Sequence, residues 1–424
     1  MDKKYITRIV DQLLENKLKG KGAVLIQGPK WCGKTMTAEQ KAKSVIYMDE
    51  PERKEQNILL ADISPSVLLE GESPRLIDEW QIAPKLWDAV RFSVDHKKGK
   101  GQYILTSSSV PAEVAETSHS GTGRFAWLTM RNMSLFESGE SNGNVSLADL
   151  FSGNSNISGT NVLSLKQIAY LVCRGGWPDI LDLEEDIALE SAYDYLDGIV
   201  NSDISRVDGI TRNPERARRI MRSYARNQGT QISFSEIARD ISTNEIGFSD
   251  ETISSYVKAL KRIFVIDDMP AWNPNLRSKT SFRATDTRYF SDSAIAAASL
   301  GIGPNDLIND LNTFGLLFES MCVRDLRTYA DSLNGSVYHY RDRRGLECDA
   351  VIHLRDGKYG LVEIKLGGDK LINEGANNLL RLESLIDTEK MNAPSFKMIL
   401  TAVDRYAYMR PDGVFVVPIG CLKN

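Results

Sequence analysis

The spacing of apolar residues in the first 135 positions alternates between that of helices and that of strands. Apolar residues at helical intervals predict a helix over 5–18, and similar spacing marks 36–43, 50–74 and 87–94. Short apolar runs between them predict strands at 23–26, 44–49, 75–78, 102–108 and 125–128. Strands that alternate with helices favour a mostly parallel sheet, so we expect an α/β domain here.

The remaining chain consists of a stretch of low apolar content, a mainly helical region and a C-terminal region with several predicted strands. Residues 138–160 are rich in Ser, Gly and Asn and are typical of a surface loop or linker. Helical spacing predicts mainly helices up to residue 262, with a strand at 264–269, and one long helix at 311–333. Strands are expected at 336–341, 347–354 and 359–366. We therefore expect three domains, over 1–160, 161–300 and 301–424.

The two strands at 347–354 and 359–366 flank Asp356-Gly357, which is typical of a hairpin turn. Apolar residues occupy even positions in both strands, from Ala350 to Leu354 and from Val362 to Leu366. If both sets face the same core, even residues pair with even residues, and the loop contains an odd number of residues. We predict a loop of three or five residues, or a compensating bulge. The acidic and basic residues at odd positions then converge on the other face.

Composition limits the class of protein. The chain has 424 residues, of which 42% are hydrophobic and 26% charged, which is typical of globular domains. Its longest apolar runs are far shorter than a membrane span, and residues 1–5 do not resemble a signal peptide. The five scattered cysteines form no CxxC pair, so we predict neither zinc nor disulfides. A cytoplasmic protein without membrane contact is expected.

Net charge is −5, which argues against a globally basic nucleic-acid-binding protein. Residues 201–290 nevertheless contain 15 Lys/Arg against 11 Asp/Glu. Within this region, arginines lie in two rows at helical spacing over 212–226. The rows indicate a solvated basic helix face, a phosphate-backbone contact, or packing against an acidic neighbour.

The sequence GPKWCGKT at 28–35 has the form G-x-x-x-x-G-K-T and lies between a predicted strand and a predicted helix. Gly28 and Gly33 allow the tight turn that aims backbone N–H groups at a phosphate chain. Lys34 is expected to reach the β- and γ-phosphates, and the Thr35 hydroxyl to hold Mg²⁺. We expect ATP to contact the whole loop and the next residue: Gly28, Pro29, Lys30, Trp31, Cys32, Gly33, Lys34, Thr35 and Met36.

A second acidic motif strengthens this prediction. The predicted strand at 75–78 ends in Asp78-Glu79. In phosphoryl-transfer sites an Asp at a strand end holds Mg²⁺ and a neighbouring carboxylate polarises the attacking water. Asp78 and Glu79 fit these two roles. The sites predicted at 28–35, 78–79 and 106–107 all follow the C-terminal ends of strands, where open α/β sheets bind ligands.

These motifs resemble a prokaryotic family of AAA+-type P-loop ATPases that carry a C-terminal restriction-endonuclease-like domain of uncharacterised function. The resemblance rests on 28–35, 76–81, 103–108, Gly123-Arg124 and 135–137. It implies that Thr106 or Ser107 senses the γ-phosphate, although Ser107-Ser108 replaces the more usual Gly-Ser. It also implies that Arg124 acts as an arginine finger in a neighbouring subunit of a homo-oligomer. A structural Arg at the start of a strand is the alternative.

The predicted helices at 232–241 and 248–262, followed by a strand, have the order of a winged helix. This region resembles the winged-helix modules attached to many ATPases. The second helix presents Ser254, Ser255, Lys258, Lys261 and Arg262, which suit a DNA groove. Such modules also dock proteins, so DNA is one of two possible partners.

Asp349 and Glu363-x-Lys365 form a further acidic group. Two neighbouring carboxylates bind Mg²⁺, and a lysine beside them activates water or stabilises developing charge. The pattern resembles the D…ExK group of restriction-endonuclease-like domains, and this resemblance adds Glu319 on the preceding helix. A chance match of so short a pattern is the alternative.

Together these motifs predict an ATP-binding and ATP-hydrolysing enzyme that uses Mg²⁺ and acts on or near DNA. One alternative is a DNA-binding regulator or docking protein that uses ATP as a slow switch. A second is a Mg²⁺-dependent nuclease gated by ATP.

Overall fold

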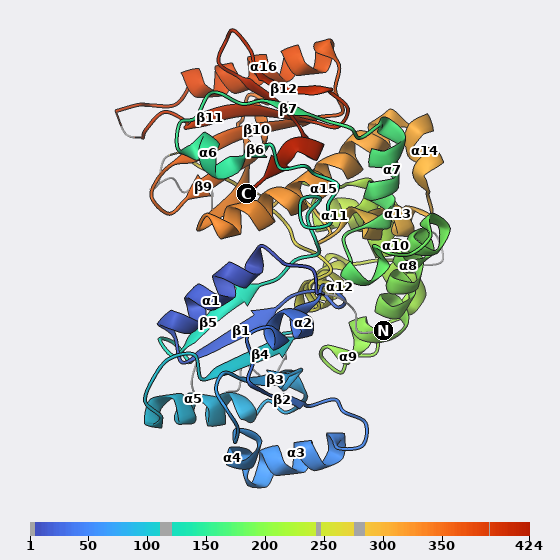
Figure 1. The fold of residues 1–424 in the computed structure, drawn as a ribbon. Coiled ribbons are helices and arrows are strands. Elements are labelled where there is room, and N and C mark those ends of the chain that lie inside the picture. The colour runs from blue at the N-terminus through green and yellow to red at the C-terminus, as the bar shows by residue number, and fades with distance from the viewer. Residues whose placement is uncertain (1–4, 111–120, 243–246, 275–284, 390) are drawn as a thin grey trace. The chain divides into compact units, whose positions relative to one another are not determined.

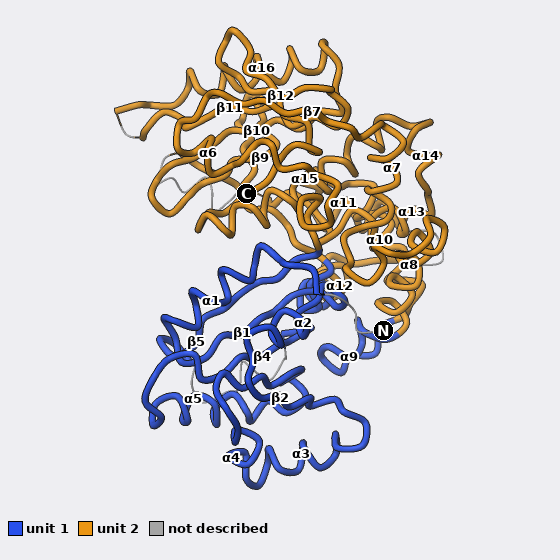
Figure 2. Tube along the Cα trace, viewed as in Figure 1, with its two compact units in different colours: residues 1–132, 202–212, 258–265 blue, residues 133–201, 213–257, 266–424 orange. Residues whose placement is uncertain are grey.

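The computed structural model describes residues 5–110, 121–242, 247–274, 285–389 and 391–424 (Figure 1). Two compact units divide the chain (Figure 2). Unit 1 consists of residues 1–132, 202–212 and 258–265, and unit 2 of residues 133–201, 213–257 and 266–424. Each unit is therefore assembled from separate parts of the chain, and the helix at 250–262 contributes to both.

Unit 1 is built on a five-stranded parallel sheet of order β2-β3-β4-β1-β5. Its strands are β1 (Ala23–Gln27), β2 (Ser44–Tyr47), β3 (Arg75–Asp78), β4 (Tyr103–Ser107) and β5 (Phe125–Thr129). Its helices are α1 (Val10–Gly20), α2 (Lys34–Glu39), α3 (Lys54–Ile63), α4 (Pro65–Leu68), α5 (Leu86–His96), α9 (Ile204–Arg206) and the last part of α12 (Asp250–Arg262). The predicted parallel α/β sheet is present.

Both faces of this sheet are buried, which explains the continuous apolar runs of its strands. Leu14 and Leu18 of α1 pack with Val24 and Ile26 on one face. On the other face, Trp87 of α5 joins Leu25, Leu105 and neighbouring residues. Because β4 lies between β3 and β1, the C-terminal ends of β3 and β4 lie next to the segment that follows β1. The sheet thereby brings the predicted site motifs together at the C-terminal ends of its strands.

Unit 2 contains a seven-stranded mixed sheet of order β7-β12-β13-β11-β10-β9-β8 and a two-stranded pair, β14-β6. Its strands are β6 (Val145–Ser146), β7 (Gly159–Thr160), β8 (Gly335–Arg341), β9 (Glu347–Leu354), β10 (Tyr359–Lys365), β11 (Phe396–Thr401), β12 (Tyr406–Met409), β13 (Phe415–Pro418) and β14 (Leu422–Lys423). Its helices are α6 (Leu147–Phe151), α7 (Leu165–Arg174), α8 (Glu185–Gly198), α10 (Pro214–Arg226), α11 (Phe234–Ile241), the first part of α12, α13 (Ser293–Leu300), α14 (Pro304–Asn309), α15 (Leu311–Ser332) and α16 (Asp369–Ser384).

Residues 138–160 differ from the expected linker. They form β6, α6 and β7, and they belong to unit 2. Gly159 and Thr160 pair with Ala407 and Tyr406, and Val145 pairs with Leu422. These partners lie more than 240 positions away in the sequence, so a local composition rule does not reveal them. The first boundary between the two units along the chain falls at 132/133, before this segment.

Two predicted helices are shorter than expected. The first begins at Val10 instead of Tyr5, because the Asp11 carboxylate accepts hydrogen bonds from the Arg8 N–H and the Tyr5 hydroxyl. This arrangement holds the preceding residues outside the helix. The helix expected over 36–43 is α2, which ends at Glu39.

The middle region contains the expected helices, and α11 begins with a capping box between Ser233 and Glu236. The expected strand at 264–269 is reduced to two antiparallel bridges, Ile266 with Phe290 and Met269 with Thr287. Phe264 has a φ of 58°, which turns the chain before a regular strand can start. Residues 275–284, between the bridged segments, lie outside the described residues, and the winged helix stays a prediction.

Candidate functional site

The phosphate loop follows β1 and is folded around the Lys34 side chain. The buried Lys34 ammonium donates hydrogen bonds to the carbonyl oxygens of Gly28 (3.1 Å) and Pro29 (2.7 Å). A Cβ on Gly28 would lie 2.0 Å from the Met130 carbonyl oxygen, so a larger residue does not fit there. Gly33 has a φ of 96°, in the left-handed region that glycine adopts at little cost. Both glycines are therefore required by geometry, as the motif predicts.

Asp78, at the end of β3, accepts two hydroxyl hydrogen bonds at a single oxygen. Thr35 Oγ1 lies 2.8 Å and Thr106 Oγ1 2.6 Å from Asp78 Oδ1. Burial raises the pKa of Asp78, while the two hydroxyl donors oppose that rise. Hydroxyl and carboxylate oxygens are the ligands that Mg²⁺ takes from a protein when phosphates and waters complete its shell. The pair of Thr35 and Asp78 fits that role.

Glu79 follows directly and has an unusual backbone conformation. Its φ of 52° and ψ of 46° are left-handed, and its N–H donates to Thr106 Oγ1 over 3.0 Å. Thr106 thus links both acidic residues, while the Ser107 hydroxyl donates instead to the Ser109 carbonyl oxygen. The structure brings Thr106, and not the Ser107 side chain, to the acidic pair.

The Glu79 carboxylate has two partners that the sequence interpretation missed. Ser108 Oγ donates to Glu79 Oε2 over 2.8 Å, and Gln81 Nε2 donates to the same oxygen. Strand alternation was a usable signal for Ser108, because residues 106 and 108 share a face when β4 is extended by one residue. Gln81 reaches Glu79 only through the turn after β3, which the sequence pattern does not specify.

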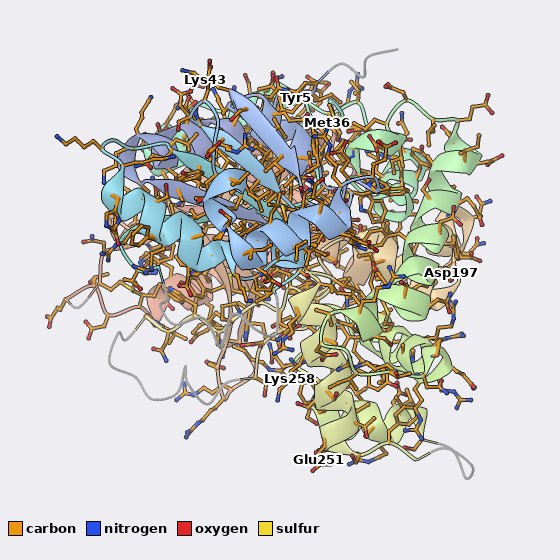
Figure 3. All side chains as sticks on the ribbon, turned by 90° about the horizontal axis from the view of Figure 1, so that it is seen from below. Tyr5, Met36, Lys43, Asp197, Glu251 and Lys258 are labelled. Carbon is orange, nitrogen blue, oxygen red and sulfur yellow. The ribbon has the colours of Figure 1, made fainter. Side chains whose placement is uncertain are left out.

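The segment before α1 also contacts the phosphate loop. The buried Arg8 guanidinium donates to the carbonyl oxygens of Cys32 (2.7 Å) and Arg131 (2.9 Å). The Tyr5 hydroxyl lies 3.0 Å from Thr37 Oγ1 in α2, and Figure 3 shows Tyr5 near Met36. These contacts join the loop to the N-terminal segment, and a single sequence gives no signal that would have predicted them.

The remaining residues of the loop differ in their surroundings. Lys30 forms an ion pair with Asp203 over 2.7 Å, and both residues belong to unit 1. Trp31 is half-exposed and has a φ of 66°. Cys32 is buried with its Sγ 3.7 Å from the Met130 carbonyl oxygen, and Met36 is partly buried.

Arg124 does not lie near the phosphate loop of its own chain. It immediately precedes β5, whereas Gly28 follows the parallel neighbouring strand β1, so the two residues lie at opposite ends of these strands. Each strand has five residues at about 3.3 Å per residue, so its two ends lie about 16 Å apart. Arg124 forms an exposed ion pair with Asp95 (2.8 Å). Any action of Arg124 on ATP therefore requires the site of another subunit.

In unit 2, the hairpin prediction is confirmed. Tyr359 pairs with His353, and the Leu354 N–H donates to the Lys358 carbonyl oxygen, which leaves a loop of the three residues 355–357. Gly357 takes the left-handed position with a φ of 88°. Odd positions also include buried apolar residues, such as Val351 and Leu361, so both faces of the hairpin are buried. The prediction of an odd loop length is unaffected, because it requires only that the apolar residues at even positions of both strands face the same side.

Three charged residues at odd positions of the hairpin converge, whereas Glu347 forms an exposed ion pair with Arg341 (3.1 Å). Lys365 Nζ lies 3.0 Å from Asp349 Oδ2 and 2.7 Å from Glu363 Oε2. Glu319, on α15, accepts a hydrogen bond from the Tyr289 hydroxyl. Burial, together with the neighbouring Asp349 charge, raises the pKa values of Glu319 and Glu363 to about 8. We call Glu319, Asp349, Glu363 and Lys365 the carboxylate–lysine cluster.

This cluster is not arranged as a metal centre. The Lys365 ammonium bridges the Asp349 and Glu363 carboxylates, and the Tyr289 hydroxyl donates a hydrogen bond to the Glu319 carboxylate. Within the described part of the chain, no group of three or more His, Cys, Asp or Glu side chains is placed to hold a metal ion. The residues predicted for the C-terminal site are together, but Mg²⁺ binding by them stays a prediction.

Three family models match successive parts of the chain. Residues 20–138 match an AAA domain, residues 165–306 a domain of unknown function (DUF8612), and residues 314–422 a further domain of unknown function (DUF4143). The AAA match covers the phosphate loop, Asp78, Glu79 and Thr106. It supports, together with the parallel sheet, a P-loop ATPase domain in this part of the chain. A search of curated proteins found no match.

Among solved structures, the chain is similar to the Walker-type ATPase PABY2304 of Pyrococcus abyssi. The identity is 13% and the TM-score 0.42, over 68% of this chain and 94% of that one. None of the helices in the described ranges has the length and apolar character needed to cross a membrane.

Proposed function

We propose that unit 1 binds ATP with Mg²⁺ and hydrolyses it. The observation that carries this proposal is the meeting of the Thr35 and Thr106 hydroxyls at one oxygen of Asp78, with Glu79 linked to the same threonine. Three separate segments supply these groups, as a phosphoryl-transfer site requires. The AAA match over residues 20–138 supports the same reading.

Each residue has a defined part in the proposed reaction. Lys34 leaves the loop carbonyls to compensate the charge of the phosphates, and Thr35 and Asp78 hold Mg²⁺. The bound ion would neutralise charge on the β- and γ-phosphates. Glu79 accepts a proton from the attacking water. Thr106 holds Asp78 and Glu79 in position, because its hydroxyl donates to the Asp78 carboxylate and accepts from the Glu79 N–H.

The proposal is tested by the change Lys34→Ala, with Lys43→Ala as the matched control. Lys43 is an exposed lysine of unit 1, labelled in Figure 3. Lys34→Ala should weaken ATP binding at least tenfold and reduce hydrolysis to background, because the phosphates lose their compensating charge. Lys43→Ala should behave like the unmodified chain. Equal ATP binding and hydrolysis in both variants would refute the assigned site. Arg124 enters the proposal only as a residue supplied to a neighbouring subunit's site.

The carboxylate–lysine cluster favours a second candidate function, Mg²⁺-dependent cleavage of nucleic acid. Its support is the convergence of Asp349, Glu363 and Lys365, which strand parity predicts independently of any family. In the structure, the Lys365 ammonium lies between the Asp349 and Glu363 carboxylates. Asp349→Ala should abolish any Mg²⁺-dependent cleavage and leave ATP hydrolysis intact. An unmodified chain that cleaves neither DNA nor RNA in Mg²⁺ would remove this candidate.

Contact with DNA is a separate proposal and rests on α12. Lys258 and Lys261 are exposed, and Arg262 lies 3.8 Å from Asp208. If these residues contact phosphates, DNA affinity should fall steeply as salt rises, and neutralising all three should flatten that slope. An affinity unchanged by the triple substitution would reject the contact and favour a protein partner.

A further inference from the structure

Gln81 occupies a distinctive position beside the proposed water-activating residue. It lies in the short 3-10 turn Trp80–Ile82, immediately after β3 and Glu79. Its Nε2 donates to Glu79 Oε2 and lies 3.4 Å from Ser108 Oγ, which donates to the same carboxylate oxygen. The carboxylate is therefore held by two side chains that come from the ends of two different strands.

The backbone explains how Gln81 reaches this position. Glu79 is one of four described non-glycine residues with a positive φ, and its N–H is fixed by Thr106 Oγ1. The Ile82 N–H then donates to the Glu79 carbonyl oxygen over 3.1 Å, which closes the turn and folds Gln81 back toward Glu79. Such a conformation is unfavourable for a residue other than glycine and persists only where its surroundings enforce it. Here the enforced conformation coincides with the proposed catalytic residue.

The other end of the Gln81 amide has different surroundings. Gln81 Oε1 is shielded from solvent and accepts no hydrogen bond from the part of the chain that the structure describes. Exchanging the amide oxygen and nitrogen would place a carbonyl oxygen against the Glu79 carboxylate, which is repulsive, so the charge of Glu79 fixes the orientation. A sheltered acceptor thus lies beside the carboxylate, and a buried acceptor without a donor is costly.

We propose that Gln81 is a second water-positioning residue of the ATPase site, and that Ser108 fixes the Glu79 carboxylate. This inference rests on the proposed ATP hydrolysis. A water molecule has two protons to donate, and Glu79 and Gln81 Oε1 provide two neighbouring acceptors. With both protons engaged, a lone pair on the water oxygen is directed outward, toward the γ-phosphorus.

The step balances without a further reactant. The water oxygen forms a bond to the γ-phosphorus while the bond from phosphorus to the bridging oxygen breaks. The electron pair of that bond leaves with ADP, and one water proton passes to the Glu79 carboxylate. Gln81 gains no proton, because its amide oxygen only orients the water. Its loss should therefore slow turnover without weakening ATP binding.

The main test compares Gln81→Met with Gln56→Met. Methionine keeps the length of the side chain and removes the amide, and Gln56 is an exposed glutamine on α3 of the same unit. For Gln81→Met we expect a single-turnover hydrolysis rate about 10- to 100-fold lower, with the Kd for ATP within about twofold of the unmodified chain. Gln56→Met should change neither quantity. Ser108→Ala should lower the rate by a smaller factor and also leave the Kd unchanged.

A second variant gives a readout that a purely structural role would not move. Gln81→Glu retains an acceptor oxygen at the end of a side chain of the same length, whereas Gln81→Met has none. Its single-turnover hydrolysis rate should therefore lie well above that of Gln81→Met, although both variants lack the amide. A Gln81→Glu chain as slow as Gln81→Met, or a Gln81→Met chain that hydrolyses ATP at the unmodified rate, would overturn the inference. So would a weaker Kd at unchanged rate.

Failure of this inference is distinguishable from failure of the proposed function. If Glu79→Gln turns over ATP normally, the assignment of Glu79 is wrong and Gln81 has no water to position. If Glu79→Gln is inactive while Gln81→Met is fully active, the ATPase proposal stands and only the role of Gln81 is lost. A thermal melting curve for each variant shows that the compared chains are folded.

Discussion

Asp78 in unit 1 and Asp349 in unit 2 are both largely buried, yet their partners differ in charge. Asp78 accepts hydrogen bonds from two neutral hydroxyls, whereas Asp349 accepts from the Lys365 ammonium and from the Ile364 N–H. Hydroxyls stabilise a carboxylate without cancelling its charge, and they can rotate toward another acceptor. The proposed contact of Asp78 with Mg²⁺ depends on this uncancelled charge.

The carboxylate–lysine cluster has a different balance. Lys365 compensates Asp349 and Glu363, and burial raises the pKa values of Glu319 and Glu363, which favours their neutral forms. Similar acidic residues at the ends of strands thus give a carboxylate held by neutral hydroxyls in one unit and an internally neutralised group in the other. The comparison teaches that the donors around a carboxylate decide its chemistry more than its place in a sheet.

The largest expected effect comes from removing the charge that neutralises the cluster. Lys365→Met leaves Asp349 and Glu363 buried without their cation, and breaking a buried pair costs about 3–5 kcal/mol. We expect urea unfolding of the full chain to show a loss of about 3 kcal/mol. Lys358→Met, at an exposed lysine of the same hairpin, is the control. A Lys365→Met chain as stable as this control would show that Lys365 does not neutralise the cluster.

A smaller effect is expected from removing one of the hydroxyls that donate to Asp78 in unit 1. Thr106→Val keeps the shape of the side chain but removes the hydroxyl that Asp78 and the Glu79 N–H share. A hydrogen bond to a charged group contributes about 1.5–3 kcal/mol, which corresponds to a roughly 10- to 150-fold decrease in kcat. Steady-state ATPase measurements provide the check, with Ser107→Ala as the neighbouring control. A greater decrease for Ser107→Ala would reverse the assignment of the two residues.

The smallest effect is a dependence of stability on pH. The folded-state pKa of Glu319 is raised to about 8 from an ordinary value near 4.5, mainly by burial and then by Asp349. At pH values between these two pKa values, Glu319 is protonated in the folded chain and ionised in the unfolded chain. The free energy of unfolding therefore decreases as the pH rises toward 8.

Glu319→Gln should remove that loss, because glutamine is neutral and its amide oxygen can still accept from Tyr289. Asp349, Glu363 and Lys365 face the same group and remain unchanged. We expect the variant to gain about 1 kcal/mol over the unmodified chain at pH 8 relative to pH 7. A difference between the two chains that is the same at both pH values would contradict the raised pKa.

The parts of the fold that followed from the sequence were those with local causes. The phosphate loop is set by two glycines in a contiguous motif, and the odd number of residues in the hairpin loop follows from residue parity. By contrast, β7 pairs with β12 and β6 with β14, across more than 240 positions. The stretch rich in Ser, Gly and Asn that contains β6 and β7 was therefore expected to be a surface loop or linker. Nonlocal pairing overrode local composition there.

The candidate site shows the same division. Lys34, Thr35, Asp78 and Glu79 belong to short motifs whose chemistry is readable from residue type and spacing. Arg8, Gln81 and Ser108 act through tertiary contacts, and the position of Gln81 depends on the left-handed conformation of Glu79. No propensity predicts that conformation for a glutamate. The sequence motifs therefore predicted the groups that we propose to react, whereas the contacts that orient these groups depend on the tertiary fold.

The most direct test of ATP hydrolysis by unit 1 is a paired measurement on Glu79→Gln. ATP binding and single-turnover hydrolysis are followed in the same preparation, beside the unmodified chain. We predict that Glu79→Gln binds ATP with a Kd within about twofold of the unmodified chain and hydrolyses it at least 100-fold more slowly, because only the activation of water is lost. Hydrolysis at the unmodified rate would contradict the account.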